Sequence, residues 1–257
     1  MSATSEEGEL AERARAFWRA HQAAVCDVQE AWAHGTVLRA SRHPSYYSFN
    51  MVRVEEEPAM DAAELASFAD SVLGDLRHRR IDFEQIEPGQ ARRADFERMG
   101  WKTTALVWMH HSDPGALGAD EGFDVEEVPY ETADGLRLAW HLEDFDGSAY
   151  DESFRAGAQE IAEARDVRVL IVREGGEPVA FAQVERAGEE AEVTQVFVHP
   201  DRRGAGRGTS MTRAAIRAAA DVGDLWIVAD AEDRPQRLYE RLGFVPVCRT
   251  MELTWLP

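Results

Sequence analysis

Cysteine is nearly absent from this chain of 257 residues, which has one in each half, Cys26 and Cys248. Neither has the spacing of a metal-binding motif, so we expect two buried thiols and neither a disulfide nor a zinc site. No stretch approaches the roughly 18 uninterrupted apolar residues that span a membrane. The N-terminal segment is acidic and lacks the apolar run of a signal peptide, which predicts a soluble, cytoplasmic protein without a membrane partner.

Basic residues are also scarce. The chain has 28 lysines and arginines against 48 aspartates and glutamates, a formal net charge of −20. Nucleic acids are bound through a basic face, so we expect no nucleic-acid partner. A cationic substrate is easier to accommodate than an anionic one. With 44% hydrophobic residues, the chain can bury the core of one large domain or two modest ones.

One stretch combines a buried strand, a glycine-rich turn and a helix. Residues 192–198 are rich in β-branched and aromatic side chains, which predicts a strand that Pro200 ends. Every second residue from 204 to 208 is glycine. Residues 209–222 then carry apolar side chains at the spacing of one helical face.

Such a loop exposes backbone N–H groups at the positive end of a helix dipole, and its glycines let a phosphate approach closely. The arginines in or beside the loop oppose the acidic charge of the chain; they are Arg202, Arg203, Arg207 and Arg213. The pattern favours a diphosphate site, and the alternative is a tight turn with solvated arginines. It fits neither the dinucleotide motif G-x-G-x-x-G nor a nucleotide P-loop.

The loop and a later segment together resemble a known family. Residues 203–208, RGAGRG, match R/Q-x-x-G-x-G/A and resemble the pyrophosphate-binding loop of the GNAT superfamily of N-acetyltransferases. Residues 232–244, EDRPQRLYERLGF, resemble the later L-Y-x-x-L-G-F motif of that family, with Gly243 as the left-handed C-cap of its helix. The resemblance covers residues 123–257 and implies an acyl-CoA N-acyltransferase fold.

An internal repeat extends this fold to the first half. Residues 96–101, FERMGW, echo residues 239–244, YERLGF, at an offset of 143 residues. The same offset places a predicted strand on a strand and a predicted helix on a helix, which indicates a duplication. We therefore predict an α/β fold (α+β, mixed sheet) of two tandem GNAT-like domains. The turn-rich residues 112–118 set the boundary, with a degenerate domain at 1–113 and a catalytic domain at 114–257.

Three further segments carry local expectations. Residues 10–34 have apolar side chains at helical spacing and predict one helix that Gly35 closes. By the resemblance, the loops that meet the acceptor substrate lie around residues 140–155 and in a late hairpin at residues 245–250.

The resemblance also implies catalytic residues. In the family an amine attacks the thioester of acetyl-CoA, which requires a base for the amine and a proton donor for the thiolate. Glu192 stands eleven residues before Arg203, where several members carry the general base. Its rivals are Glu190 and Gln195, the latter only as a water holder. Tyr239 is the motif tyrosine whose phenol serves as general acid, and the alternative is a core tyrosine with its hydroxyl at a boundary.

Acetyl-CoA is accordingly the expected co-substrate, and no metal is expected. The main chain of Val196, Phe197 and Val198 would pair with the pantetheine arm. The diphosphate would be held by Arg203, Gly204, Ala205, Gly206, Arg207, Gly208 and Thr209. The family often has Asn-x-x-Ala before its tyrosine, whereas this chain has Glu232 and Pro235, which leaves cofactor contacts from that turn open.

These features predict an N-acetyltransferase that moves an acetyl group directly to a primary amine of a small molecule or peptide. The alternative is a non-catalytic acyl-CoA-binding or interaction module. Retention of both Glu192 and Tyr239 favours the enzyme.

The first half lacks the corresponding residues. At the offset of 143, Glu192 and Tyr239 fall on Phe49 and Phe96, and the loop positions fall on Met60, Ala63 and Leu65. We therefore expect one acetyl-CoA per chain. Burial of an open edge, shaping of the acceptor pocket and formation of a homodimer remain open roles for this half.

Overall fold

The computed structural model describes residues 3–117, 122–144, 152–232 and 235–256. The chain forms two compact units, the first of residues 1–108, 229–233 and 247–257, and the second of residues 109–228 and 234–246. The C-terminal segment belongs to the first unit because residues 251–255 pair antiparallel with residues 79–83. The boundary expected after residue 113 lies close to the first break, but it assigned this C-terminal segment to the second domain.

The first unit is a mixed sheet with three helices. Its helices are α1 (Ala3–Ala23), α2 (Ala62–Leu73) and α3 (Ile86–Arg98), and its strands include β1 (Val28–Trp32), β2 (Gly35–Arg39), β3 (Met51–Val54), β4 (Arg79–Phe83) and most of β5 (Lys102–His111) and β11 (Val245–Trp255). A 3-10 turn, η1, covers Tyr47–Phe49. The strand order is β1-β2-β3-β4-β11-β5. Strands β3 and β4 are parallel, whereas β1–β2, β2–β3 and β4–β11 are antiparallel.

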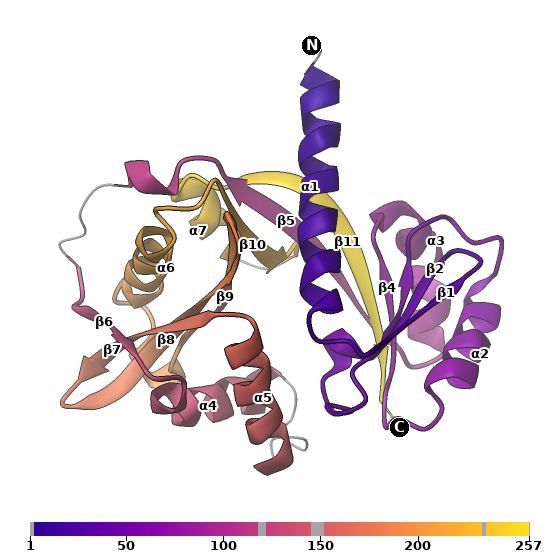
Figure 1. Cartoon of the computed structure of the whole chain (residues 1–257), viewed down its shortest axis with the longest axis horizontal. Helices are drawn as coiled ribbons and strands as arrows, with labels where there is room; N and C mark the ends of the chain where they lie inside the picture. The colour runs from indigo at the N-terminus through magenta and orange to yellow at the C-terminus, as the bar shows by residue number, and fades with distance from the viewer. Residues whose placement is uncertain (1–2, 118–121, 145–151, 233–234, 257) are drawn as a thin grey trace. The chain divides into compact units, whose positions relative to one another are not determined.

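Helices cover both faces of this sheet (Figure 1). Side chains alternate along β3, so neighbouring residues point to opposite faces. Val52 and Val54 pack in the same apolar cluster as the buried residues of α2. On the other face, Met51 and Arg53 contact Gln22 of α1. Helix α1 and helix α2 therefore lie on opposite sides of β3.

The helix expected over residues 10–34 is wrong beyond Ala23. Helix α1 ends at Ala23, and residues 28–32 instead pair with residues 35–39 as a β-hairpin. Gly35 is a strand residue and not a helix cap. A Cβ at this position would lie 2.1 Å from the carbonyl oxygen of Arg53, so only glycine fits against the neighbouring strand.

The second unit is built around antiparallel strands with one parallel addition. Its helices are α4 (Asp134–Asp144), α5 (Glu152–Ala164), α6 (Arg207–Ala218) and α7 (Pro235–Arg241), with 3-10 turns η2 (Pro114–Ala116), η3 (Tyr130–Ala133) and η4 (Pro200–Arg202). Its strands are β6 (Val125–Val128), β7 (Val167–Glu174), β8 (Glu177–Ala187), β9 (Glu190–Val198) and β10 (Asp224–Asp230). They run in the order β10-β9-β8-β7-β6, and only the β9–β10 pair is parallel.

The helices of this unit also divide between the two faces of its sheet (Figure 1). Val169, Ile171 and Phe181 form an apolar cluster with η3 and α4. Arg168 points to the other face of β7 and donates a hydrogen bond to the Ala218 carbonyl at the end of α6. Helices α4 and α6 thus sandwich strands β7 and β8.

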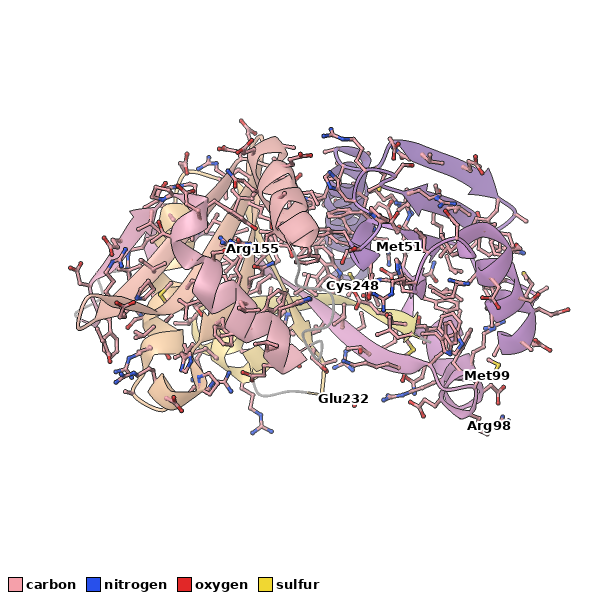
Figure 2. All side chains as sticks on the ribbon, turned by 90° about the horizontal axis from the view of Figure 1, so that it is seen from below. Met51, Arg98, Met99, Arg155, Glu232 and Cys248 are labelled. Carbon is pink, nitrogen blue, oxygen red and sulfur yellow. The ribbon has the colours of Figure 1, made fainter. Side chains whose placement is uncertain are left out.

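The duplicated fold predicted from the repeat is confirmed in the details of one turn. After α3, the N–H of Trp101 donates to the carbonyl of Phe96 at 3.0 Å, and after α7 the N–H of Phe244 donates to the carbonyl of Tyr239 at 3.1 Å. The glycine before each of these aromatic residues has a left-handed φ, +84° in the first unit and +98° in the second. Figure 2 labels Met99 at the end of α3, where its side chain is partly exposed.

Candidate active site

The glycine loop precedes α6 in a conformation that requires glycine. Gly204 and Gly206 have φ values of +86° and +85°, a region that residues with a Cβ rarely adopt. Gly206 is the N-cap of α6, and no side chain caps the helix there. A Cβ on either glycine would meet no atom within 4 Å, so the loop opens onto free space. These features fit an anion at the N-terminus of the helix.

The first turn of α6 approaches the end of β9. A Cβ on Gly208 would lie 3.9 Å from a methyl group of Val198. Ala205 is exposed, and Thr209 is half-buried in the same turn. The structure thus brings the loop residues 203–209 beside the last residues of β9.

Carboxylates engage the arginines of this loop. Arg203 donates to the carbonyl of Val198 at 3.0 Å and to both oxygens of Glu143 at 2.6 and 2.8 Å. Arg207 forms an ion pair with Glu174, with Nε at 2.6 Å. The sequence did not indicate Glu143 and Glu174, because they come from α4 and β7. A diphosphate at this loop would compete with both carboxylates for the guanidinium groups.

Strand β9 contains a bulge between Glu192 and the glycine loop. Phe197 pairs with Phe181 and Thr194 pairs with Gln183, so β9 has one extra residue in this interval. Gln195 in the bulge has a φ of +48°. The bulge reorients the residues that follow it, as is common beside active sites.

The parallel pairing of β9 with β10 ends just before this bulge. Its register runs from residues 190–193 of β9 to residues 224–227 of β10, whereas β9 continues to Val198. The main chain of Val196, Phe197 and Val198 therefore lies beyond the paired part of the two strands. On its other edge this stretch pairs with β8. An open strand edge of this kind suits an extended ligand that adds main-chain hydrogen bonds.

Glu192 is buried in the paired part of β9. Its side chain faces Glu185 across the β8 ladder and Trp226 across the β10 ladder. The residue is 6% exposed, and its Oε2 atom is buried without a hydrogen-bond partner. Burial and then the charge of Glu185 raise its pKa to about 8, against an opposing effect of Arg165. A carboxylate with this proton affinity suits a general base near neutral pH.

Glu185 and Arg165 were not identified from the sequence. Arg165 follows the end of α5 and forms an ion pair with Glu185, which also accepts a hydrogen bond from the Thr194 hydroxyl at 3.1 Å. Burial raises the pKa of Glu185, and the Arg165 charge opposes that rise. The available signal was a glutamate in the apolar run of β8, where a buried strand would otherwise carry apolar residues.

The two rival residues have other surroundings. Glu190 accepts a hydrogen bond from the indole of Trp226 at 3.2 Å. Gln195 lies on the bulge, and its Oε1 atom is buried without a hydrogen-bond partner. Glu190 is thus engaged at the start of the strand, whereas Gln195 has an acceptor that a water could satisfy.

Tyr239 is held in the aromatic cluster that follows α7. Its side chain is 7% exposed, and its ring packs edge-on against Phe244 with centroids 6.1 Å apart. The Phe244 ring packs in turn against His111 at 5.2 Å. A Cβ on Gly243 would lie 2.7 Å from Nε2 of His111, so glycine is required for this packing as well as for its φ. These contacts fix the ring of Tyr239.

The expected acceptor segments are only partly described. Residues 145–151 lie outside the described residues, and the flanking parts belong to α4 and α5. The late hairpin expected at residues 245–250 is wrong, because these residues lie within the single long strand β11. Residues 251–255 of this strand pair with β4, a long-range contact that the local sequence does not predict.

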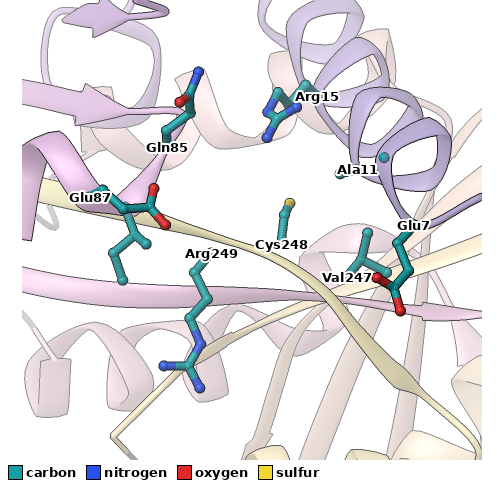
Figure 3. Close-up of a pocket in the computed structure, with 10 residues that line it drawn as sticks. Glu7, Ala11, Arg15, Gln85, Glu87, Val247, Cys248 and Arg249 are labelled. Carbon is teal, nitrogen blue, oxygen red and sulfur yellow. The ribbon is translucent and has the colours of Figure 1, made fainter. Parts of the chain in front are cut away.

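A cavity of about 500 Å³ lies in the first unit among α1, the start of α3 and β11 (Figure 3). Arg15 on its wall pairs with Glu12 at 3.2 Å. Burial raises the pKa of the Cys248 thiol to about 11, so this thiol is protonated at neutral pH. The residues that line the cavity include none of the expected catalytic or cofactor-binding residues.

The described residues contain no group of three or more histidine, cysteine, aspartate or glutamate side chains that could hold a metal ion. Within the same residues, no helix has both the length and the apolar character needed to cross a membrane.

Comparisons with known proteins agree with the motifs. Residues 165–246 match the family model described as acetyltransferase (GNAT) domain. A GCN5-related N-acetyltransferase from Kribbella flavida has a similar structure, with a TM-score of 0.63 and 20% identity over 95% of this chain and 94% of that one. No curated relative matches the chain at a significant level.

Two further structures share the fold. A functionally unknown conserved protein from Staphylococcus epidermidis has a TM-score of 0.66 at 15% identity, over 88% of this chain and 92% of that one. A tandem GNAT protein from the clavulanic acid biosynthesis pathway has a TM-score of 0.51 at 18% identity, over 79% of this chain and 74% of that one. At these identities the likeness concerns the fold alone.

Proposed function

We propose that the chain transfers an acetyl group from acetyl-CoA to a primary amine, because residues 165–246 match the family model of a GNAT acetyltransferase domain. The acceptor would be a small molecule or a peptide. The reaction is assigned to the second unit, which holds all the candidate catalytic and cofactor-binding residues.

One observation carries this proposal. Glu192 lies buried one residue before the pairing of β9 and β10 ends, and the same strand leads through a bulge to the glycine loop. A candidate base, an open strand edge and a candidate anion site thus follow one another along a single stretch of chain. That order suits a ligand with a thioester at one end and a diphosphate at the other.

We propose a separate role for each group of residues in this reaction. Residues 203–209 would hold the diphosphate, and the main chain of residues 196–198 would hold the pantetheine arm. Acetyl-CoA, when bound, supplies the thioester. Glu192 would accept the proton of the acceptor, because an alkylammonium with a pKa near 10.4 must lose a proton before it can attack. Tyr239 would donate a proton from its hydroxyl to the departing sulfur.

The acidic composition supports a cationic acceptor. The net charge of −20 favours the approach of positively charged molecules. At the site itself, two buried carboxylates, Glu185 and Glu192, accompany one guanidinium, Arg165. An ammonium group would balance the charge of this trio when both carboxylates are ionised.

The proposal is tested by free-thiol release from acetyl-CoA with a panel of small amines, polyamines and peptide N-termini. We expect release that depends on the amine and that Glu192→Gln lowers by roughly 10² to 10⁴. Tight binding of acetyl-CoA without release by any amine of the panel would favour the non-catalytic binding module instead.

A further inference from the structure

Arg165, Glu185 and Glu192 form a buried trio in which the arginine is paired with only one of the two carboxylates. Glu185 and Glu192 are direct neighbours across the β8–β9 ladder, and each is 6% exposed. The Arg165 guanidinium is paired with Glu185. The Thr194 hydroxyl donates to the same carboxylate at 3.1 Å, which fixes Glu185 from the side of β9.

Glu192 is the carboxylate of the trio that has no ion-pair partner among the described residues. Its Oε2 atom is buried without a hydrogen-bond partner, although a guanidinium lies close enough to influence its charge. Buried carboxylates normally take the nearest available cation, and a base that is paired with an arginine is a poor proton acceptor.

We propose that Glu185 is a positioning residue, which holds Arg165 away from Glu192 and so keeps the Glu192 carboxylate free to accept a proton from the acceptor amine. This inference rests on the proposed function for its catalytic meaning. The arrangement of the trio itself can be tested without any substrate.

Other charged or titratable groups lie on the elements around this face. Helix α4 carries His141, which is buried, and Arg137, which donates to Gln183 of β8 at 3.2 Å. On β9, Glu190 accepts from Trp226. The titration of Glu192 must therefore be measured at its own carboxyl, because a signal from the whole protein would also include the titration of these groups.

These interactions predict the order of the Glu192 pKa in the wild type, a single variant and a double variant. In the wild type, burial and the charge of Glu185 raise the pKa of Glu192 to about 8, and Arg165 opposes them with a smaller effect. Glu185→Gln removes the raising charge and frees Arg165 to pair with Glu192, so the pKa should fall most in this variant. Glu185→Gln combined with Arg165→Met leaves burial alone, so its pKa should lie between the other two.

The experiment is an NMR titration of carbon-13-labelled glutamate carboxyls in the full chain without ligand, with the Glu192 signal assigned through its loss in Glu192→Gln. We expect Glu185→Gln to lower the Glu192 midpoint by about one pH unit or more. The double variant should recover part of this shift, and it also covers the case in which an unpaired guanidinium prevents the single variant from folding. Glu127→Gln, which removes an exposed carboxylate that pairs with Arg168 at 3.1 Å, is the matched control and should leave the midpoint unchanged.

The outcomes separate the two proposals. An unchanged Glu192 midpoint in folded Glu185→Gln, or a wild-type midpoint near the ordinary value for glutamate, would overturn the positioning role. If the midpoints follow the expected order but no amine releases thiol from acetyl-CoA, the trio is as inferred and the proposed function fails. If the enzyme is active, the acid limb of its kcat/KM profile should move with the Glu192 midpoint in each variant.

Discussion

Phe96 occupies in the first unit the place that Tyr239 occupies in the second. Each carbonyl accepts the N–H of the aromatic residue five positions later, and each ring packs edge-on against that residue, with centroids 5.1 Å apart for Phe96 and 6.1 Å for Tyr239. The chain therefore already contains a phenylalanine in this local structure. The hydroxyl of Tyr239 is not required to form the turn.

This equivalence predicts a clean separation of activity from stability. Tyr239→Phe should fold with nearly the wild-type thermal midpoint and bind acetyl-CoA with nearly unchanged affinity. Its turnover should fall by roughly 10² to 10⁴ if the phenol is the general acid. Steady-state kinetics with calorimetric binding checks this, and full turnover in the variant would exclude Tyr239 as the acid.

A second prediction concerns the approach of the diphosphate to Gly208. This glycine is the second residue of α6, its φ is not left-handed, and an added Cβ would make only an ordinary contact with Val198. Gly208→Ala should thus raise the stability by about 0.5 to 1 kcal/mol through helix propensity. If the diphosphate approaches here, the same methyl group should weaken acetyl-CoA binding by about tenfold or more.

Gly135→Ala is the matched control for this prediction. Gly135 is the second residue of α4, and an added Cβ there meets no atom within 4 Å. The control should show a similar gain in stability with unchanged acetyl-CoA affinity by calorimetry. Equal affinity in both variants would place the diphosphate elsewhere.

The burial of Glu192 also predicts how stability depends on pH. Its pKa is about 8 in the folded chain and near 4.5 when exposed, so between these values the folded state holds a proton that the unfolded state has lost. Stability from this group is therefore present below about pH 4.5 and is lost as the pH rises toward 8. Glu192→Gln removes the effect, so the thermal midpoint of the variant relative to the wild type should increase from about pH 5 to about pH 8.5. Thermal unfolding at both pH values tests this, and a constant difference would show that Glu192 titrates normally.

A fourth prediction is the binding of one acetyl-CoA per chain. In the first unit the parallel strands β3 and β4 stay paired to their ends, where Glu84 N–H donates to the Val54 carbonyl at 3.0 Å. Arg53 and Thr36 bond to Glu55, which directly follows β3. Among the described residues of this unit, the end of β3 therefore has neither the open edge nor the glycine loop that follows β9. Equilibrium titration of the full chain should give a stoichiometry of one, and two sites per chain would contradict the degenerate first unit.

Local features were predictable from the sequence because local rules govern them. Asp61 caps α2, and its side chain accepts from Glu64 N–H in a capping box, an arrangement that depends only on residues 61–64. The strand, loop and helix of the central stretch lie within a few residues of their expected bounds. The hairpin of β1 and β2 was missed because Val28 and Trp32 also fit the period of a helix.

Long-range pairing was not predictable from local pattern. The register between β8 and β9 places Glu185 opposite Glu192, and the turn after α5 brings Arg165 to the same place. Strand β11 likewise pairs with β4 of the first unit, which is far from it in the sequence. These contacts depend on which strands pair and in which register, and the sequence of one segment alone does not predict either.

The central claim is that the second unit moves an acetyl group to an amine, and the most direct measurement is the balance between acetylated amine and free CoA. Mass spectrometry of the amine and a thiol assay on the same sample should give equal amounts of the two products in the wild type. The combined Glu192→Gln and Tyr239→Phe variant should form neither at a comparable rate. Thiol release without acetylated amine, or the same product yield from the combined variant, would contradict the account.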